Sequence, residues 1–320
     1  MMRTPRFVAR LLLLPALALL AAGCWNRTEV NDLAIVQLTS YDWEDDQYRV
    51  GVSFPLVSQM SETQGGGGGT GGKEGQNKYL ESARAPAIRA AFNHVQRKVS
   101  RRLYFAHRRV LLIGEAIAER GVTDILDNLS RFPENRISTY LLVAKGSALG
   151  LMQTPVLTER VTAEMFREIV VNTMNEPVTA RDFIHAILTE GVDAYTLAFK
   201  RSKTDTPGQE ATKADTVEID GLAVFRDDRL AGILEQPFLN GALLALGQLK
   251  RPVVTVDLPE GRGHITVQFL KMTSRVEPVV NGDDIRMILT ISGIFEISSN
   301  ETDINLIHYE NHDKATKAIE

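Results

Sequence analysis

Cys24 is the residue whose chemistry its neighbours define most clearly. It is the single cysteine among 320 residues, and it directly follows Ala21-Ala22-Gly23. Small side chains there would let a peptidase reach the backbone, and the thiol behind them is a nucleophile that a diacylglyceryl transferase could acylate. Without a second cysteine the chain can form no intrachain disulfide, and acylation removes the liability of a free thiol in an exported protein. We therefore expect Cys24 to carry a lipid.

The 23 residues before Cys24 have the composition of a secretion signal. Arg3, Arg6 and Arg10 precede an apolar run from Leu11 to Leu20, which is too short to span a bilayer. The arrangement resembles the lipobox of bacterial lipoproteins, with Ala21 where leucine is usual. It predicts a signal peptide over 1–23 and acyl chains such as palmitate on Cys24, each buried methylene contributing about 0.8 kcal/mol to membrane attachment. The alternative is an ordinary cleaved signal peptide followed by an unmodified cysteine.

Charge is distributed unevenly along the mature chain. Loss of three arginines with the signal leaves 33 basic against 40 acidic residues, a net charge of −7, which disfavours nucleic-acid binding. Yet residues 82–114 contain no Asp or Glu. Such a basic stretch could face anionic lipid headgroups, at about 1 kcal/mol per nearby basic residue, meet an acidic partner surface, or form a solvated face. The candidate membrane or partner contacts are Arg97, Lys98, Arg101, Arg102, Arg108 and Arg109.

No catalytic or metal-binding spacing accompanies these features. The six histidines form no H-E-x-x-H pattern, and no serine stands in a G-x-S-x-G elbow. Gly67, Gly72 and Lys73 match G-x-x-x-x-G-K, but Glu74 occupies the position where a P-loop needs a hydroxyl. We therefore expect no enzymatic activity, no cofactor and no metal.

The elements that must position these residues change character once along the chain. In the first part, helices alternate with strands, and the acidic stretch 42–46 is expected to be the turn of an antiparallel pair. A glycine-rich surface loop is expected at 62–77. The polar segment 200–215, with Pro207 and Gly208 near its centre, predicts a linker. After it come a hairpin across Asp227-Asp228, four strands between 253 and 291, and a helix opening at 302–306.

These expectations give an α+β fold with several domains. A mixed α/β domain over 24–199 precedes a mainly antiparallel β-sheet domain with helices over 216–320. Each half has enough residues for a modest core of its own.

Five stretches together resemble one family, the Ger(x)C spore germination lipoproteins. The first is Cys24 to Ala34, which is similar to the mature N-terminus of the family. The others are Tyr104 to Gly114, Arg131 to Arg136, Val143 to Gly146, and Gly221 to Leu234. The similarity runs in the expected order over most of residues 20–297.

The resemblance implies the C subunit of a nutrient germinant receptor, a non-enzymatic protein. It would be held by its lipid on the outer face of the spore inner membrane, beside two integral-membrane partners, the A and B subunits. Relatives continue for several dozen residues beyond the point that corresponds to Glu320, so the C-terminal domain is expected to be incomplete. Only Cys24 is carried over from the family as a site residue.

Two functions from other classes compete with this one. A substrate-binding lipoprotein of a transporter would require two similar α/β lobes around a cleft, and the chain contains no internal duplication. A secreted hydrolase would require a nucleophile and base that no motif supplies.

Overall fold

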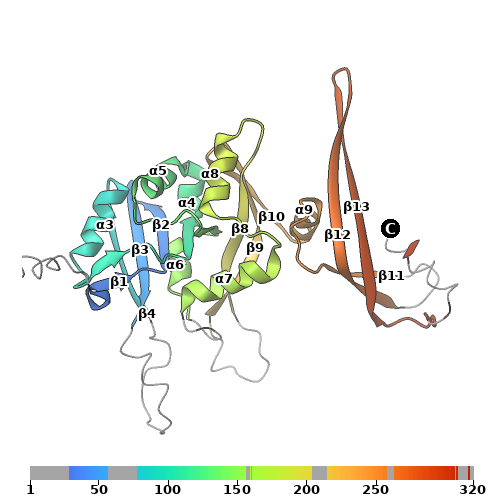
Figure 1. Ribbon diagram of the computed structural model, residues 1–320, viewed down its shortest axis with the longest axis horizontal. Helices are drawn as coiled ribbons and strands as arrows, with labels where there is room; N and C mark the ends of the chain where they lie inside the picture. Colours follow the sequence, from blue (N-terminus) through green and yellow to red (C-terminus); the bar gives the residue numbers. More distant parts are fainter. Residues whose placement is uncertain are drawn as a thin grey trace, which may run out of the picture.

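The computed structural model describes residues 29–56, 78–155, 159, 161–203, 215–257, 263–306, 308 and 316–317. Cys24 and the glycine-rich segment 62–77 lie outside the described residues. The described chain forms one large mixed sheet flanked by helices, a short two-stranded sheet, and a separate antiparallel sheet near the C-terminus (Figure 1). This arrangement confirms the predicted α+β class.

The large sheet has a parallel centre and antiparallel margins. In spatial order its strands are β10 (Arg229–Glu235), β9 (Asp215–Arg226), β8 (Tyr195–Lys203), β7 (Tyr140–Ala144), β6 (Val110–Gly114), β2 (Leu38–Glu44), β3 (Gln47–Pro55) and β4 (Lys78–Ala85). Strands β2, β6, β7 and β8 run parallel, while β3, β4, β9 and β10 join by antiparallel pairing. Central parallel strands require cover on both faces, and all five residues of β6 are buried accordingly.

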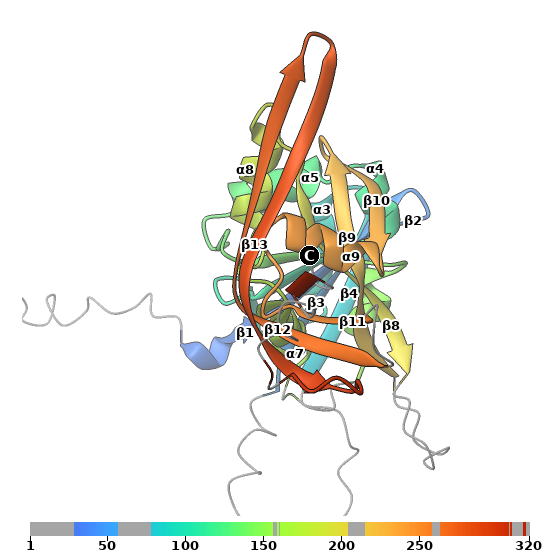
Figure 2. The ribbon, with the colours of Figure 1, turned by 90° about the vertical axis from the view of Figure 1, so that its right-hand side faces the viewer.

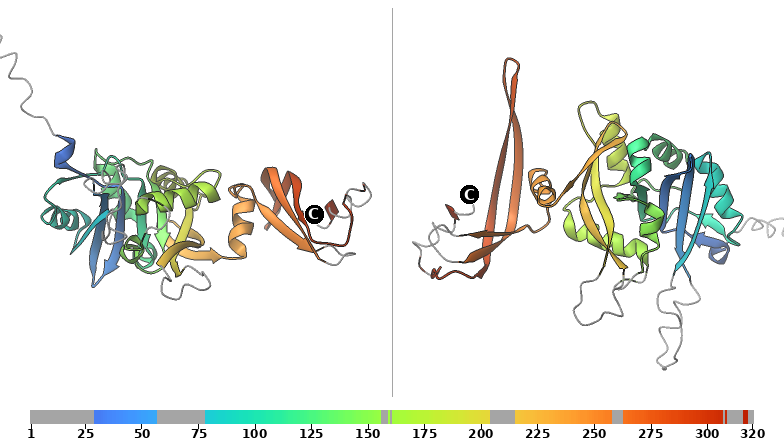
Figure 3. Two further views of the ribbon diagram at one scale, coloured as in Figure 1. Left: turned by 90° about the horizontal axis from the view of Figure 1, so that it is seen from below. Right: turned by 180° about the vertical axis from the view of Figure 1, so that it is seen from behind.

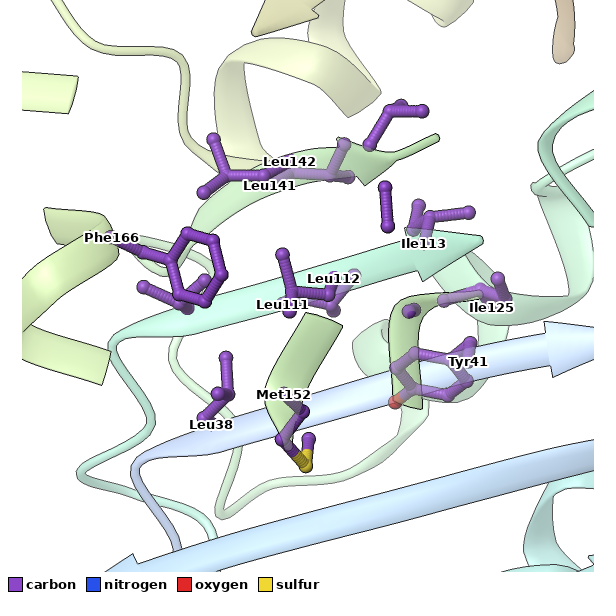
Figure 4. Packing of buried hydrophobic residues seen from close by; sticks show 14 of the residues in the cluster. Leu38, Tyr41, Leu111, Leu112, Ile113, Ile125, Leu141, Leu142, Met152 and Phe166 are labelled. Carbon is purple, nitrogen blue, oxygen red and sulfur yellow. The ribbon is translucent and has the colours of Figure 1, made fainter. Parts of the chain in front are cut away.

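Helices provide that cover. They are α3 (Ile88–Gln96), α4 (Glu115–Arg120), α5 (Thr123–Arg131), α6 (Ala148–Met152), α7 (Thr162–Thr173) and α8 (Ala180–Leu188). Apolar residues of α3 at helical spacing, Ile88, Ala91, Phe92 and Val95, are buried against β3 and β4. On one face of the central strands, Leu38, Leu112 and Leu142 lie with Met152 of α6 and Phe166 of α7 (Figure 4). On the other face, Tyr41 packs edge-on against Phe92 of α3.

The predicted antiparallel pair exists, but its turn is shorter than expected. Strands β2 and β3 pair from Leu38↔Ser53 to Glu44↔Gln47, so the turn consists of Asp45 and Asp46, both with positive φ. Asp42 is a buried strand residue instead of a turn residue. The expectation that 42–46 is a turn was therefore wrong at residues 42–44, because β2 continues through them.

The N-terminal strand lies beside the main sheet. A short 3-10 helix, η1 (Val30–Asp32), leads into β1 (Leu33–Ile35), which pairs in parallel with β5 (Arg102–Tyr104). In this register Leu33 is opposite Arg102. The pairing fixes the start of the described chain next to the basic stretch.

Both ends of the predicted linker, 200–215, lie in the main sheet. Residues 200–203 of β8 and residue 215 of β9 belong to neighbouring antiparallel strands of the same sheet. Phe225 of β9 packs edge-on against Phe183 of α8, with ring centroids 4.8 Å apart. The buried carboxylate of Asp220 contacts Lys200 Nζ at 3.2 Å. The ends of the predicted linker, 200–203 and 215, are therefore strand residues, while residues 204–214 lie outside the described residues.

The structural break comes later, at α9 (Phe238–Ala245). Beyond it β11 (Val253–Asp257), β12 (His264–Asn281) and β13 (Asp284–Asn300) form a three-stranded antiparallel sheet that stands apart from the main body (Figure 3). The expected strands at 265–270 and 275–280 are one continuous strand, β12. Residues 302–306 form bends and a turn, so the helix expected there is not formed.

The β12–β13 hairpin extends well beyond α9 as a long two-stranded ribbon (Figure 2). Because side chains alternate between faces, one face of the ribbon is almost wholly apolar. Its exposed members include Val276, Val280, Ile285, Met287, Leu289 and Ile291. Within the described part of the chain, no helix is both long and apolar enough to cross a membrane.

Candidate functional site

Four exposed basic residues gather where α3 ends and β5 begins. Arg97, Lys98 and Arg101 lie on the turn between the two elements, and Arg102 opens β5. We call these four residues the tether-side basic surface. Leu33, opposite Arg102, is nine positions after Cys24, and an extended chain of that length spans at most about 30 Å. A lipid on Cys24 would therefore hold this surface within about 30 Å of the bilayer.

Only part of this positive charge is neutralised. Lys98 Nζ lies 3.1 Å from Glu81 Oε1, and Arg102 pairs with Glu134. Arg97 and Arg101 form no ion pair with any described residue. Exposed pairs of this kind contribute at most about 1 kcal/mol, so an anionic surface can compete for Lys98 and Arg102. The surface can thus act as an electrostatic contact.

Arg108, another predicted contact, faces the interior. Its exposure is only 4%. Its guanidinium donates to Asn135 Oδ1 at 3.1 Å and to Thr39 Oγ1 at 3.5 Å, beside Tyr41. Burial lowers the pKa of Arg108 and raises that of Tyr41, because both charged forms lose hydration. The prediction of a membrane or partner contact was wrong for Arg108, since a buried side chain cannot reach either.

Arg109, the neighbouring residue, is exposed but lies elsewhere. It pairs with Glu164 of α7 and lines a pocket with Arg136 and Arg167. The six residues selected from the sequence therefore fall into three places: the tether-side basic surface, the interior, and this pocket.

The charged stretch 131–136 serves as a junction between elements. Glu134 pairs with Arg102, and Asn135 donates to Leu129 O at 2.9 Å while it accepts from Arg108. The stretch thereby connects the end of α5 to β5 and to the segment before β6.

A groove beside the β2–β3 turn was missed by the sequence reasoning. The guanidinium of Arg120 stacks on Trp43, 3.9 Å from the ring centroid, and Tyr48 donates its hydroxyl to Asp124. Burial and then Asp124 raise the pKa of Tyr48 to about 12, so its hydroxyl stays protonated at neutral pH. The cavity is about 460 Å³. Aromatic residues at 43 and 48 are separated by a turn, so no fixed sequence spacing indicates the groove.

No metal-binding geometry is found among the residues that the structure describes. There, no three His, Cys, Asp or Glu side chains are grouped so that they could hold an ion. Cys24, the predicted lipid-bearing residue, stays a prediction because it is outside those residues.

Comparison with known proteins supplies the family evidence. The family described as "Spore germination protein N-terminal domain" matches residues 26–200, and that described as "Spore germination B3/ GerAC like, C-terminal" matches residues 220–320. The two matched regions lie on either side of the polar segment 204–214.

Individual relatives agree with these matches. "Putative spore germination protein YfkR" of Bacillus subtilis (strain 168) is 36% identical over 286 residues, which cover 89% of this chain and 73% of that protein. "Spore germination protein KC" of the same organism is 25% identical over 306 residues, covering 90% and 74%. Among solved structures, the crystal structure of the GerBC protein is similar at 16% identity with a TM-score of 0.45, covering 88% of this chain and 80% of that one.

Proposed function

The chain belongs to the GerAC-type spore germination protein family, and on that premise we propose that it is the lipid-anchored, non-enzymatic C subunit of a nutrient germinant receptor. The observation that carries the proposal is that both family regions match in order, over 26–200 and 220–320. The relatives' names refer to germination and to no reaction. Its partners in this proposal are the integral-membrane A and B subunits of the receptor.

The proposed anchor is a lipid on Cys24 at the outer face of the spore inner membrane. The parallel pairing of β1 with β5 supports a defined orientation, because it places Arg102 beside the strand that follows the tether. Arg97, Lys98, Arg101 and Arg102 would then face anionic headgroups. Each basic residue near such a surface contributes about 1 kcal/mol, a modest addition to the lipid anchor.

The first experiment compares spores that express the chain as wild type or as Cys24→Ala. We expect wild type in the inner-membrane fraction with a normal nutrient response, and the variant lost from that fraction with a reduced response. Immunoblots of both chains in the mother cell control for expression. A variant that stays in the membrane and germinates normally would contradict the lipid anchor. Correct location without any germination defect on deletion of the whole chain would favour a transporter lipoprotein.

A second experiment tests the orientation with a lipid-free chain carrying Cys24→Ala. Replacing Arg97, Lys98, Arg101 and Arg102 by Gln should weaken binding to phosphatidylglycerol vesicles at least tenfold, because four contributions of about 1 kcal/mol are removed. The matched control replaces four exposed basic residues elsewhere, Arg181, Lys203, Arg226 and Arg229, by Gln. An equal loss in both variants would contradict a specific membrane-facing surface.

A further inference from the structure

A pocket of about 410 Å³ lies at the start of two neighbouring parallel strands. Val110 of β6 is opposite Tyr140 of β7, so the segments that precede both strands meet at one edge of the sheet. The third side is supplied by α7. The polar residues that line the pocket are His107, Arg109, Arg136, Ser138, Tyr140 and Arg167.

The lining contains cations and hydroxyls, and none of its described members is a carboxylate. Glu164 pairs with Arg109 and lies 3.4 Å from Arg167, which also pairs with Glu168. These two carboxylates orient the arginines from outside the lining. Arg136 forms no ion pair with any described residue.

The buried residue Arg108 also borders the pocket, but its guanidinium lies at a separate small cavity beside Phe105 and Asn135. Three guanidiniums of the lining, those of Arg109, Arg136 and Arg167, therefore stand against two carboxylates, Glu164 and Glu168. Arg136 is left without a counter-charge among the described residues, and an anion in the pocket would supply one.

We propose that this pocket binds a small multivalent oxyanion with a phosphate group. Each guanidinium presents a planar fork of donors that matches phosphate or carboxylate oxygens. Arg109, Arg136 and Arg167 approach from three segments, and a tetrahedral phosphate can offer oxygens to all three, whereas a planar carboxylate has two oxygens. The hydroxyls of Ser138 and Tyr140 supply further donors. The volume fits a small molecule, so the phosphate is carried on a larger group.

This assignment does not depend on the receptor role. Two sources offer the same chemistry: a soluble phosphorylated compound and a phospholipid headgroup. A headgroup could reach the pocket because segment 106–109 follows β5, and β5 pairs with β1, the strand that follows the proposed tether from Cys24.

The test measures inorganic pyrophosphate binding to the full chain carrying Cys24→Ala, by isothermal titration calorimetry at constant ionic strength without divalent cations. We expect saturable binding that Arg136→Gln weakens at least tenfold. Arg136→Lys keeps the positive charge but loses the planar fork of donors. Its affinity for pyrophosphate should therefore lie between those of the parent chain and Arg136→Gln. Arg226→Gln is the matched control, because Arg226 is also exposed, has no described ion pair and lies outside the pocket. Equal thermal unfolding midpoints verify that each variant is folded.

Two results would overturn the proposal: no saturable pyrophosphate or vesicle binding by the parent chain, or equal weakening by Arg136→Gln and Arg226→Gln. A parallel binding experiment with lipid vesicles then distinguishes a phospholipid headgroup from a soluble phosphorylated compound. Binding to phosphatidylglycerol but not phosphatidylcholine vesicles that Arg136→Gln weakens and pyrophosphate reduces supports a headgroup ligand. Pyrophosphate binding without any effect of Arg136→Gln on vesicle binding supports a soluble ligand.

Discussion

Gly114 at the end of β6 packs so closely against Asp42 of β2 that a Cβ atom on Gly114 would overlap Oδ1 of the carboxylate. Asp42 cannot move away, because its two oxygens accept hydrogen bonds from the backbone N–H groups of Ala148 at 2.7 Å and Leu149 at 2.8 Å. Burial raises the pKa of Asp42, and these two hydrogen bonds oppose the rise. The pair fixes the start of α6 above the central strands.

The first prediction follows from this contact. Gly114→Ala should lower the free energy of unfolding by about 1–3 kcal/mol, because the added methyl group overpacks a rigid site. Urea denaturation monitored by circular dichroism measures the change. Gly150→Ala is the matched control, since its Cβ would meet only Ser147 at 3.5 Å and alanine favours the helix. Similar stability of both variants would contradict the argument.

The second prediction concerns Lys78, whose ammonium is held by neutral acceptors. Its Nζ donates to Met152 O and Thr154 O, both at 2.9 Å, and to Thr162 Oγ1 at 2.5 Å. Burial lowers the pKa of Lys78 to about 8. Below pH 8 the side chain is charged whether the chain is folded or unfolded, but between about pH 8 and its ordinary pKa of 10.5 the folded state releases its proton first.

The stabilisation that arises from the lowered pKa of Lys78 is therefore fully present in the free energy of unfolding above pH 10.5, and it is lost as the pH falls to about 8. Relative to Lys78→Met, wild type should gain about 1–2 kcal/mol of unfolding free energy between pH 7 and pH 10, after allowance for partial exposure. Urea titrations of both proteins at the two pH values give this difference. A difference that is constant with pH would show that the pKa of Lys78 is not lowered.

The third prediction compares the contribution of the buried Arg108 to stability with that of an exposed arginine, Arg101. Arg108→Ala should cost about 2–4 kcal/mol of unfolding free energy, because it empties a buried volume and leaves Asn135 and Thr39 without a donor. Arg101→Ala should cost less than about 0.5 kcal/mol, as is usual for an exposed side chain. Thermal and urea denaturation report both values, and equal costs would place Arg108 at the surface.

The fourth prediction concerns the apolar face of the β12–β13 ribbon. Large exposed apolar patches promote association, so Met287→Lys combined with Leu289→Lys should reduce self-association of the purified chain. The control places the same charges on the other face, at Ile288 and Thr290, since neighbouring strand residues alternate. Dynamic light scattering over a concentration series compares them, and an equal reduction would indicate a general effect of net charge.

Local pattern was sufficient for elements whose own residues define them. Ile88, Phe92 and Val95 stand at helical spacing in α3, and the apolar run 110–114 forms β6. The hairpin expected across Asp227-Asp228 is the β9–β10 pair. The order of five family-like stretches likewise predicted the family, which the matches over 26–200 and 220–320 confirmed. These properties depend on neighbours in sequence, so the chain alone determined them.

Only the tertiary structure decided which polar residues are buried or paired and which are exposed. Arg108 and Arg109 are adjacent and chemically identical, yet one is buried beside Tyr41 and the other pairs with Glu164. Asp42 belongs to an acidic stretch but caps a helix more than 100 residues later. Burial and partners at such separations depend on how β2, β6 and β7 stack and which helices cover them. A local count of charges carries no information about that packing, because solvation is decided by contacts between distant segments.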